Sequence, residues 1–260
     1  MKIVTYNVNG IGARLPRLLE YLEEQAPDVC CLQELKADDE KFPAAAIEGV
    51  GYGAVWHGQK SWNGVAILAK GRQPEERRRG LAGDPDDTHS RYIEATVGDV
   101  LVGCLYLPNG NPQPGPKFDY KLAWMERLIV HAAGLLATEL PAVLCGDYNV
   151  IPTLSHDDTF SVRAMAQDAL MQPESRAAFR RLLFQGWTDA LRVRHPAGPL
   201  YTFWDYQAGA WQRDAGFRID HHLLSPAAAD RLIDAGVDKV YRGREKASDH
   251  APTWVVLRDA

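Results

Sequence analysis

The feature that most constrains the fold of this chain is a series of short apolar runs with the composition of β-strands. They lie at residues 2–8, 28–33, 52–57, 65–70, 91–97, 100–107, 142–146, 217–224 and 252–257. Between them, apolar side chains recur at helical spacing over residues 15–22, 122–129 and 176–185. Strands that alternate with helices in this way predict an α/β protein with layered sheets.

The length and composition are those of a globular protein. The chain has 260 residues, of which 46 % are hydrophobic and 24 % are charged. No shift in composition marks a linker, and the Gly- and Pro-rich segments at 80–87 and 109–116 are typical of loops inside a domain. We therefore expect a single domain over residues 1–260, long enough to bury a large core.

Several classes of protein are excluded by what the sequence lacks. No apolar run approaches the roughly 18 residues of a membrane span, and the start MKIVTYNVNG has no apolar core of a signal peptide. The four cysteines sit in apolar runs without the spacing of a zinc site, which predicts buried, reduced thiols. The net charge of −5 argues against a surface covered with basic side chains. A local group of basic residues beside the site could still bind phosphates.

Polar side chains stand at the ends of several apolar runs. They are Asn7, Glu34, Asp147, Asn149, Asp220, Asp249 and His250. Any one of them could be a capping or turn residue, but unrelated turns have no reason to supply an oxygen-rich set. A carboxylate buried in such a run is costly unless it is paired or binds a metal. Oxygen ligands without cysteine suit Mg²⁺ or Mn²⁺ rather than zinc.

The same positions carry a resemblance to a known family. The segments TYNVNGI, LQELK, WNGVAIL, YLPNG, GDYN, YTFWDY, RID and SDHAP follow one another from the start of the chain to its end. Each segment alone is weak, but the ordered set is specific. The chain resembles the exonuclease III family of AP endonucleases, within the endonuclease/exonuclease/phosphatase superfamily.

The resemblance implies a fold and a site. The implied fold is a four-layer α/β sandwich of two packed mixed β-sheets flanked by helices, with the site at one edge where both sheets end. The implied ligands of Mg²⁺ or Mn²⁺ are Asn7, Glu34, Asp147, Asn149, Asp249 and His250. The implied catalytic residues are Tyr106, Asp147, Asn149, Asp220 and His250. Glu34 is expected to be the main metal ligand.

The implied roles follow from the chemistry of a phosphodiester, which is anionic and resists attack by water. Cleavage needs a cation, an activated water and donors for the developing charge. Asp147 would activate the water or hold the metal, and the sequence leaves both roles open. Asn149 would orient the water, and the hydroxyl of Tyr106 would lie near the scissile phosphate. Asp220 would hold His250 in one tautomer.

The resemblance also implies contacts with DNA. The expected DNA-binding residues are Arg91, Asn109, Lys121, Trp204 and Arg218. A solvated surface charge is the alternative for each basic residue, and a core position is the alternative for Trp204. Flat aromatic side chains could stack on an extruded sugar or base.

Two further segments are expected to have no part in catalysis. The charge run Glu75–Arg79 is typical of a solvated loop. His221 and His222 are expected as strand residues, one facing inward and one outward.

The function implied by the resemblance is that of a Mg²⁺-dependent DNA repair nuclease. It would hydrolyse the phosphodiester 5′ to an abasic site and could act as a 3′–5′ exonuclease that trims 3′ ends. Its partner would be double-stranded DNA with abasic sites or blocked 3′ ends. We expect a monomer in the cytoplasm, of the bacterial type, with no membrane association.

Two other functions remain open at this point. One is a phosphoesterase of the same superfamily that acts on a small molecule or a lipid. The other is a non-catalytic DNA-binding relative. Trp204 and Tyr106 favour DNA, and the sequence has no apolar hairpin that could dock on a membrane. A non-catalytic relative would have lost a metal or base residue, and none of the matching positions is lost.

Overall fold

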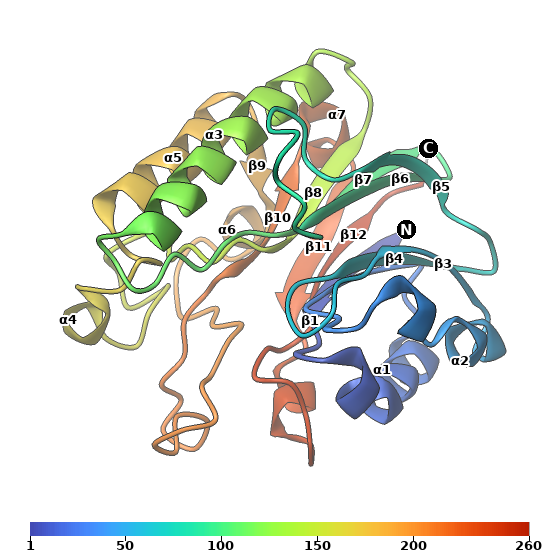
Figure 1. The fold of residues 1–260 in the computed structure, drawn as a ribbon, viewed down its shortest axis with the longest axis horizontal. Helices are drawn as coiled ribbons and strands as arrows, with labels where there is room; N and C mark the ends of the chain where they lie inside the picture. Colours follow the sequence, from blue (N-terminus) through green and yellow to red (C-terminus); the bar gives the residue numbers. More distant parts are fainter. Residues whose placement is uncertain (260) are drawn as a thin grey trace.

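The computed structural model describes residues 1–259, and its centre is a pair of six-stranded sheets packed face to face (Figure 1). The first sheet has the order β11-β12-β1-β2-β4-β3. Its strands are β1 (Lys2–Asn7), β2 (Val29–Gln33), β3 (Tyr52–His57), β4 (Val65–Lys70), β11 (Leu232–Val237) and β12 (Thr253–Leu257). Parallel and antiparallel pairs occur together, so the sheet is mixed.

The second sheet has the order β5-β6-β7-β8-β10-β9 and is also mixed. Its strands are β5 (Glu75–Arg79), β6 (Tyr92–Val97), β7 (Val100–Tyr106), β8 (Ala142–Asp147), β9 (Thr188–Asp189) and β10 (Asp220–Leu224). Every residue of β8 and of β10 is buried, because both faces of these central strands are covered.

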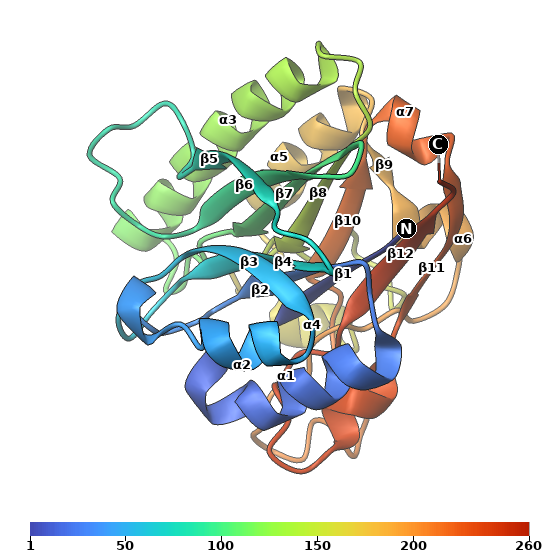
Figure 2. The same ribbon diagram turned by 90° about the vertical axis from the view of Figure 1, so that its right-hand side faces the viewer.

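Helices cover the outer faces of both sheets, which makes four layers (Figure 2). The first sheet is covered by α1 (Ile11–Gln25) and α2 (Ala44–Gly49), and the second by α3 (Pro116–Leu136) and α5 (Pro173–Phe184). Shorter helices are α4 (Val162–Met165), α6 (Ala190–Arg194), α7 (Pro226–Ala229), η1 (Asp39–Lys41) and η2 (Lys239–Gly243). The expected four-layer sandwich is therefore confirmed.

The core is divided among the layers. One apolar cluster lies between the two sheets, and one lies under the helices on each outer side. All four cysteines are free, buried thiols, as expected from their apolar surroundings. Within residues 1–259, no helix is both long enough and apolar enough to cross a membrane.

The expected strands all occur in the structure, with ends that move by up to three residues. The expectation for Glu75–Arg79 was wrong, because this charged run forms β5 and pairs with β6. It lies at the edge of its sheet with all of its side chains exposed, which is where charged strands are tolerated. The strands β9 and β11 were not foreseen from the sequence.

Strand ends from both sheets meet at one edge of the sandwich. The parallel neighbours β1 and β2 end together, with Asn7 beside Gln33. In the second sheet, β7 and β8 end together with Tyr106 beside Asp147. The antiparallel strand β10 begins at the same edge, with Asp220 opposite Asp147. This geometry collects polar residues that are far apart in the sequence.

Candidate active site

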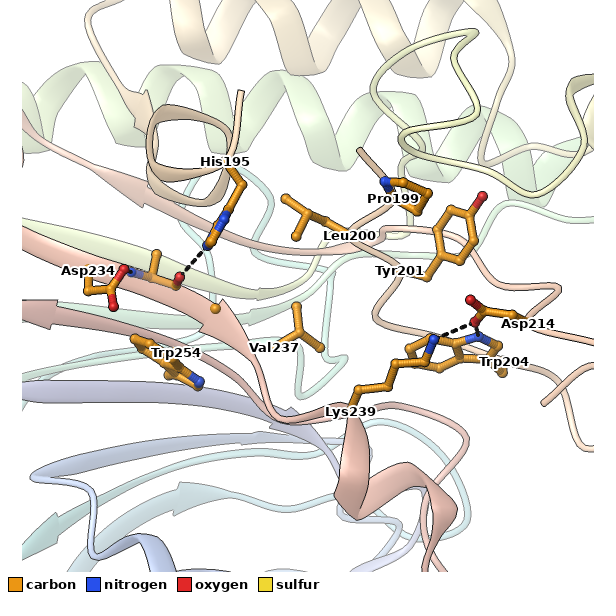
Figure 3. Close-up of a pocket in the computed structure, with 12 residues that line it drawn as sticks. His195, Pro199, Leu200, Tyr201, Trp204, Asp214, Asp234, Val237, Lys239 and Trp254 are labelled. Atoms are coloured by element: carbon orange, nitrogen blue, oxygen red, sulfur yellow. Dashed lines mark hydrogen bonds and ion pairs between the residues drawn. The ribbon is translucent and has the colours of Figure 1, made fainter. Parts of the chain in front are cut away.

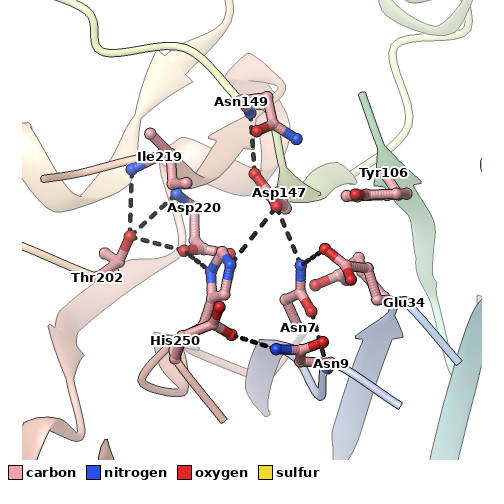
Figure 4. A network of polar contacts seen from close by, with 12 residues as sticks. Asn7, Asn9, Glu34, Tyr106, Asp147, Asn149, Thr202, Ile219, Asp220 and His250 are labelled. Atoms are coloured by element: carbon pink, nitrogen blue, oxygen red, sulfur yellow. Dashed lines mark hydrogen bonds and ion pairs between the residues drawn. The ribbon is translucent and has the colours of Figure 1, made fainter. Parts of the chain in front are cut away.

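Asp147 lies at the centre of the polar cluster at this edge (Figure 4). Its side chain is 2 % exposed. The amide nitrogen of Asn7 donates to Asp147 Oδ2 over 3.0 Å and to Glu34 Oε1 over 2.9 Å. One amide thus connects carboxylates that come from β8 and from the end of β2, so the two sheets meet through these three side chains.

His250 and Asp220 form the other side of the cluster. His250 Nδ1 lies 2.8 Å from Asp220 Oδ2, and His250 Nε2 lies 3.7 Å from Asp147 Oδ2. Thr202 also donates to Asp220 Oδ2, over 2.6 Å. Burial by itself would lower the pKa of His250, but the charge and hydrogen bond of Asp220, with help from Asp147, raise that pKa to about 10. The imidazole is therefore cationic and faces Asp147.

The burial of Asp147 changes its acidity. Burial raises the pKa of its carboxyl to about 7, the cationic His250 opposes this rise, and the carboxylates of Asp220 and Glu34 add to it. A carboxyl with such a pKa can hold or release a proton near neutral pH. It therefore suits the exchange of a proton with a bound water better than an ordinary aspartate does.

Glu34 offers a partly open carboxylate, with 17 % of its side chain exposed. Burial disfavours its charge, but hydrogen bonds from Asn7 and Lys36 hold the pKa of Glu34 below its usual range. The ammonium of Lys36 lies 2.9 Å from Glu34 Oε2, so a cation already sits beside this group. An ionised, partly open carboxylate next to an amide is a donor set that Mg²⁺ accepts.

Asp249 belongs to the same region. Its Oδ1 accepts a hydrogen bond of 3.0 Å from the side chain of Asn9, and the backbone N–H of Asn9 donates to Asn7 Oδ1 over 3.0 Å. Glu34, Asp147 and Asp249 are thereby linked through two asparagine side chains. Asn9, Lys36 and Thr202 were missed as site residues, although each lies in a segment that carried the resemblance: TYNVNGI, LQELK and YTFWDY.

A second group of possible metal ligands shares Asp147. Asp147, Asp220 and His250 present ligand atoms within 4.8 Å of one another. Nδ1 of His250 is engaged by Asp220, which leaves Nε2 as its free ring nitrogen. Asp220 Oδ1 is buried with no hydrogen-bond partner within residues 1–259. These three groups also suit proton exchange, because the pKa of Asp147 lies near 7.

Asn149 orients Asp147 from the following turn. Its backbone N–H donates to Asp147 Oδ1 over 2.9 Å, and its φ of 47° places it in the left-handed region that asparagine tolerates. Its amide nitrogen donates to Leu107 O over 2.9 Å, and its Oδ1 accepts from Asn109 over 3.1 Å. The amide oxygen accepts this one bond and keeps a second lone pair, so the expected role of Asn149 as a metal ligand stays a prediction.

Tyr106 completes the site from the end of β7. Burial raises its pKa well above the usual range, and the charges of Glu34 and Asp147 raise it further. The phenol therefore stays protonated and can donate a hydrogen bond to an anion.

A cavity of about 460 Å³ opens beside Tyr106, next to the carboxylate cluster. Its polar lining consists of amides and nitrogen bases: Gln59, Asn63, His89, Arg91, Asn109, Asn111 and Lys117. Of the described residues, none that lines it is acidic. Two of the expected DNA-binding residues, Arg91 and Asn109, lie here, so the structure brings them to the site.

The guanidinium of Arg91 is positioned to bind an anion in this cavity. Its guanidinium lies 5.0 Å from the ring centre of Tyr106 and 5.9 Å from that of Tyr120. Its Nη1 donates to Tyr106 O over 3.2 Å, whereas Nε is buried and has no partner within residues 1–259. A planar guanidinium held between aromatic rings is well suited to bind a phosphate.

The other three expected DNA contacts are corrected by the structure, because their side chains are internal. Lys121 and Trp204 are fully buried, and Arg218 is 1 % exposed. Arg218 donates to the carboxylates of Asp158 and Asp189, each over 2.7 Å. These side chains face protein atoms, so they cannot touch DNA in this conformation.

Trp204 has a core position instead of a place at the substrate. Its Nε1 donates to Asp214 over 2.8 Å, and the ammonium of Lys239 lies 2.7 Å from the same carboxylate. Figure 3 shows these residues in the wall of a cavity of about 400 Å³, whose lining includes none of the candidate catalytic residues.

His221 and His222 were expected to face opposite sides of a strand, one of them outward. Both are fully buried, because β10 is covered on both faces. His222 Nε2 contacts Thr253 O at 3.0 Å, toward the first sheet, and His221 Nε2 contacts Val150 O at 3.0 Å. Neither ring opens to solvent.

Comparison with known proteins places this geometry in a family. Residues 4–250 match the Endonuclease/Exonuclease/phosphatase family. Exodeoxyribonuclease III of Haemophilus influenzae is 34 % identical over 99 % of this chain and 100 % of its own length.

Solved structures agree with this assignment. A 3′ phosphatase, NExo from Neisseria, bound to a product DNA hairpin, matches with a TM-score of 0.95 and 40 % identity over 100 % of both chains. An AP endonuclease from Archaeoglobus fulgidus matches with a TM-score of 0.93 and 37 % identity over 99 % of both chains. The chain therefore belongs to the endonuclease/exonuclease/phosphatase family, in the group of exonuclease III and the AP endonucleases.

Proposed function

We propose that this chain is a Mg²⁺- or Mn²⁺-dependent DNA repair nuclease that hydrolyses the phosphodiester 5′ to an abasic site and trims blocked 3′ ends. The observation that carries the proposal is the position of Asp147 between an ionised Glu34 and the His250–Asp220 pair. A base (Asp147), a carboxylate that could bind a cation (Glu34) and a cationic acid (His250) thus lie next to one another. The hydrolysis of an anionic ester requires this combination.

Glu34 would hold the metal ion, with Asn7 and Asp249 beside it. When bound, the ion would neutralise charge on the phosphate and make its phosphorus more open to attack. Asn7 keeps the carboxylates of Glu34 and Asp147 at a set distance, because its amide nitrogen donates to both. The ammonium of Lys36 lies beside Glu34, so a bound metal ion would share this carboxylate with Lys36 or displace it.

Asp147 would take the proton of the attacking water. The backbone N–H of Asn149 orients its carboxylate. Burial raises the pKa of this carboxyl to about 7, so it is ionised above that pH. His250 would donate a hydrogen bond, or its proton, to a phosphate oxygen, and Asp220 keeps the ring cationic. The phenol of Tyr106 would donate to another oxygen of the same phosphate. These preorganised donors supply the charge stabilisation that water would otherwise provide.

The cavity lined by Arg91, Asn109 and Lys117 would hold the DNA strand next to the cleaved bond. It combines cations with amides and contains no carboxylate among the described residues, although the whole chain is acidic. Backbone phosphates are the ligand that such a lining fits, and double-stranded DNA with an abasic site or a blocked 3′ end supplies them. The relatives support this substrate class, because their names include an exodeoxyribonuclease, a 3′ phosphatase and an AP endonuclease.

The test uses three DNA duplexes: one with an internal tetrahydrofuran abasic analogue, one with a 3′-phosphate end and one with an undamaged recessed end. Each is incubated with the protein in Mg²⁺ and in EDTA. We expect cleavage of the abasic duplex 5′ to the analogue and release of the 3′-phosphate, both abolished by EDTA. Absence of cleavage on all three duplexes, with hydrolysis of a small phosphodiester instead, would refute the proposal.

A further inference from the structure

We infer that Lys121 and the Arg218–His221 pair are positioning residues that clamp two successive carbonyls of the turn after Asp147, and so hold Asp147 and Asn149 in the reactive geometry. The inference rests on the proposed function where it concerns the cleavage rate. It assigns a task to two cations that the sequence analysis had expected at the DNA.

The turn that needs support runs from the end of β8 into residues 148–151. Asn149 sits there with a φ of 47°, and its N–H sets the direction of the Asp147 carboxylate. The turn is held at its two sides by hydrogen bonds of 2.9 Å from Tyr148 N to Ile219 O and from Ile151 N to Leu170 O. The carbonyls of Asn149 and Val150 lie between these bonds and need partners of their own.

Lys121 satisfies the first carbonyl. It lies in α3, is fully buried, and its Nζ donates to Asn149 O over 2.6 Å and to Asn109 O over 3.0 Å. Burial lowers the pKa of Lys121 to about 7, while Asp147 and Asp168 oppose this shift. Charged or neutral, the amine keeps at least two N–H donors, so both bonds persist. Lys121 therefore joins the YLPNG loop to the catalytic turn.

His221 satisfies the second carbonyl. Its Nε2 lies 3.0 Å from Val150 O, and its Nδ1 lies 3.1 Å from Arg218 Nη1. A guanidinium can only donate, so Nδ1 must accept and Nε2 must carry the hydrogen that goes to Val150 O. Arg218 therefore selects the tautomer that supports the turn. Its own position is set by Asp158 and Asp189.

The two supports reach the turn from different layers, one from helix α3 and one from strand β10. Both are buried, so a lost partner would leave a carbonyl without water to replace it, and the turn would move to find one. A displacement of about 1 Å at a catalytic group can lower a rate about 100-fold. Neither Lys121 nor His221 lines the DNA cavity, although Lys121 reaches the back of its wall through the bond to Asn109 O.

The first experiment compares Lys121→Met with Lys117→Met, a matched change of an exposed lysine of the same helix that lines the DNA cavity. Single-turnover cleavage of the abasic duplex at saturating protein gives the rate, and fluorescence anisotropy in EDTA gives the Kd. We expect Lys121→Met to lower the rate about 10- to 100-fold and leave the Kd within about twofold. Lys117→Met, a change in the DNA cavity itself, should weaken binding.

The second experiment compares His221→Phe with His221→Gln. Phenylalanine keeps the volume and removes both hydrogen bonds, whereas glutamine can donate to Val150 O and accept from Arg218. We expect the rate to fall about 10-fold or more in His221→Phe and to recover to within about threefold of the unmodified protein in His221→Gln. A purely structural role would lower the Tm of the variants without this difference in rate at temperatures well below the Tm.

A third measurement does not depend on activity. Hydrogen exchange of residues 147–151 should quicken about tenfold in His221→Phe and Lys121→Met, and remain unchanged in Lys117→Met. If Lys121→Met does not fold, Lys121→Gln, which cannot reach both carbonyls, replaces it.

Three outcomes would overturn the inference: unchanged exchange in both clamp variants, an unchanged rate in a folded variant, or a loss confined to the Kd. Failure of the proposed function looks different, because then the unmodified protein cleaves none of the duplexes while the exchange data still test the clamp.

Discussion

Two walls of the site differ in how their charges are partnered. The closed wall, made of Asp147, Asp220, His250 and the residues behind them, is buried, and most of its polar groups are hydrogen-bonded. The open wall is the cavity lined by Arg91 and Lys117, and none of the described residues that line it is acidic.

The difference teaches how one acidic protein can bind and cut a polyanion. Buried charges with hydrogen-bond partners hold the catalytic side chains in place and shift their pKa values. They therefore govern the rate of cleavage. Cations on an open surface attract phosphates and govern affinity and its dependence on salt. Changes in the closed wall should therefore alter the rate, and changes in the open wall should alter binding.

Asp147→Asn should give the largest effect. Removing a positioned base lowers the rate about 10²- to 10⁴-fold, and a disturbed metal ion would lower it further. DNA binding should remain within a few-fold, because the open wall is intact. Single-turnover cleavage and anisotropy on the same abasic duplex measure both quantities. A cleavage rate equal to that of the unmodified protein would remove Asp147 from the mechanism.

Asp220→Asn should lower the rate about 10²-fold, again with little change in affinity. Asp220 raises the pKa of His250, so the neutral amide should let the imidazole lose its proton at lower pH. We therefore expect the alkaline limb of the pH–rate profile to move to lower pH. A profile that overlays that of the unmodified enzyme would mean that the two side chains do not act as a pair.

The ion pair behind the closed wall should appear in the pH dependence of stability. Asp158 is buried beside Arg218 and Arg192, and although burial disfavours its charge, these cations lower its pKa to about 2, below the 3.8 of an ordinary aspartate. Stability from this shift is present above pH 4 and is lost as the pH falls toward 2. Its size is about 2 kcal/mol.

Urea unfolding at pH 5 and at pH 3 measures this contribution, with Asp158→Asn as the control. The variant should be less stable at pH 5, because Arg218 loses a buried partner, and its stability should fall less between the two pH values. An equal loss in both proteins would show that Asp158 does not titrate with folding.

Arg91→Met should give the smallest effect and the opposite pattern. Loss of one phosphate contact weakens binding by about 1 kcal/mol, roughly fivefold, and reduces the slope of log K against log salt by about 1. The rate at saturating protein should stay within about threefold. A large loss of rate with an unchanged Kd would mean that Arg91 acts through Tyr106, whose carbonyl it bonds and whose ring it covers.

The sequence allowed much of the fold and the centre of the site to be predicted. Apolar runs indicated the central strands, because a strand buried on both faces needs apolar side chains along its whole length. The polar residues at their ends were therefore visible as exceptions, and Asn7, Glu34 and Asp147 do meet in the structure. The edge strand Glu75–Arg79 was missed because it joins the sheet only through backbone pairing with β6, and none of its residues is buried.

The DNA-facing residues could not be separated from the internal ones in the same way. Arg91 and Arg218 both stand next to apolar strands, and the sequence offers no local sign that one borders a cavity while the other meets Asp158 and Asp189. Lys121 has the same ambiguity, because a helical lysine is usually exposed. Its burial depends on two loops that end near it.

The central strands, the three longest helices, the polar ends of the strands and the membership of the family were determined by the sequence itself, because each depends on local pattern or on motifs that can be read along the chain. The tertiary structure alone decided which cations face DNA and which support the catalytic turn. A long side chain can lie inward or outward from the same backbone, and only the partners that folding brings to its charged end decide which is stable.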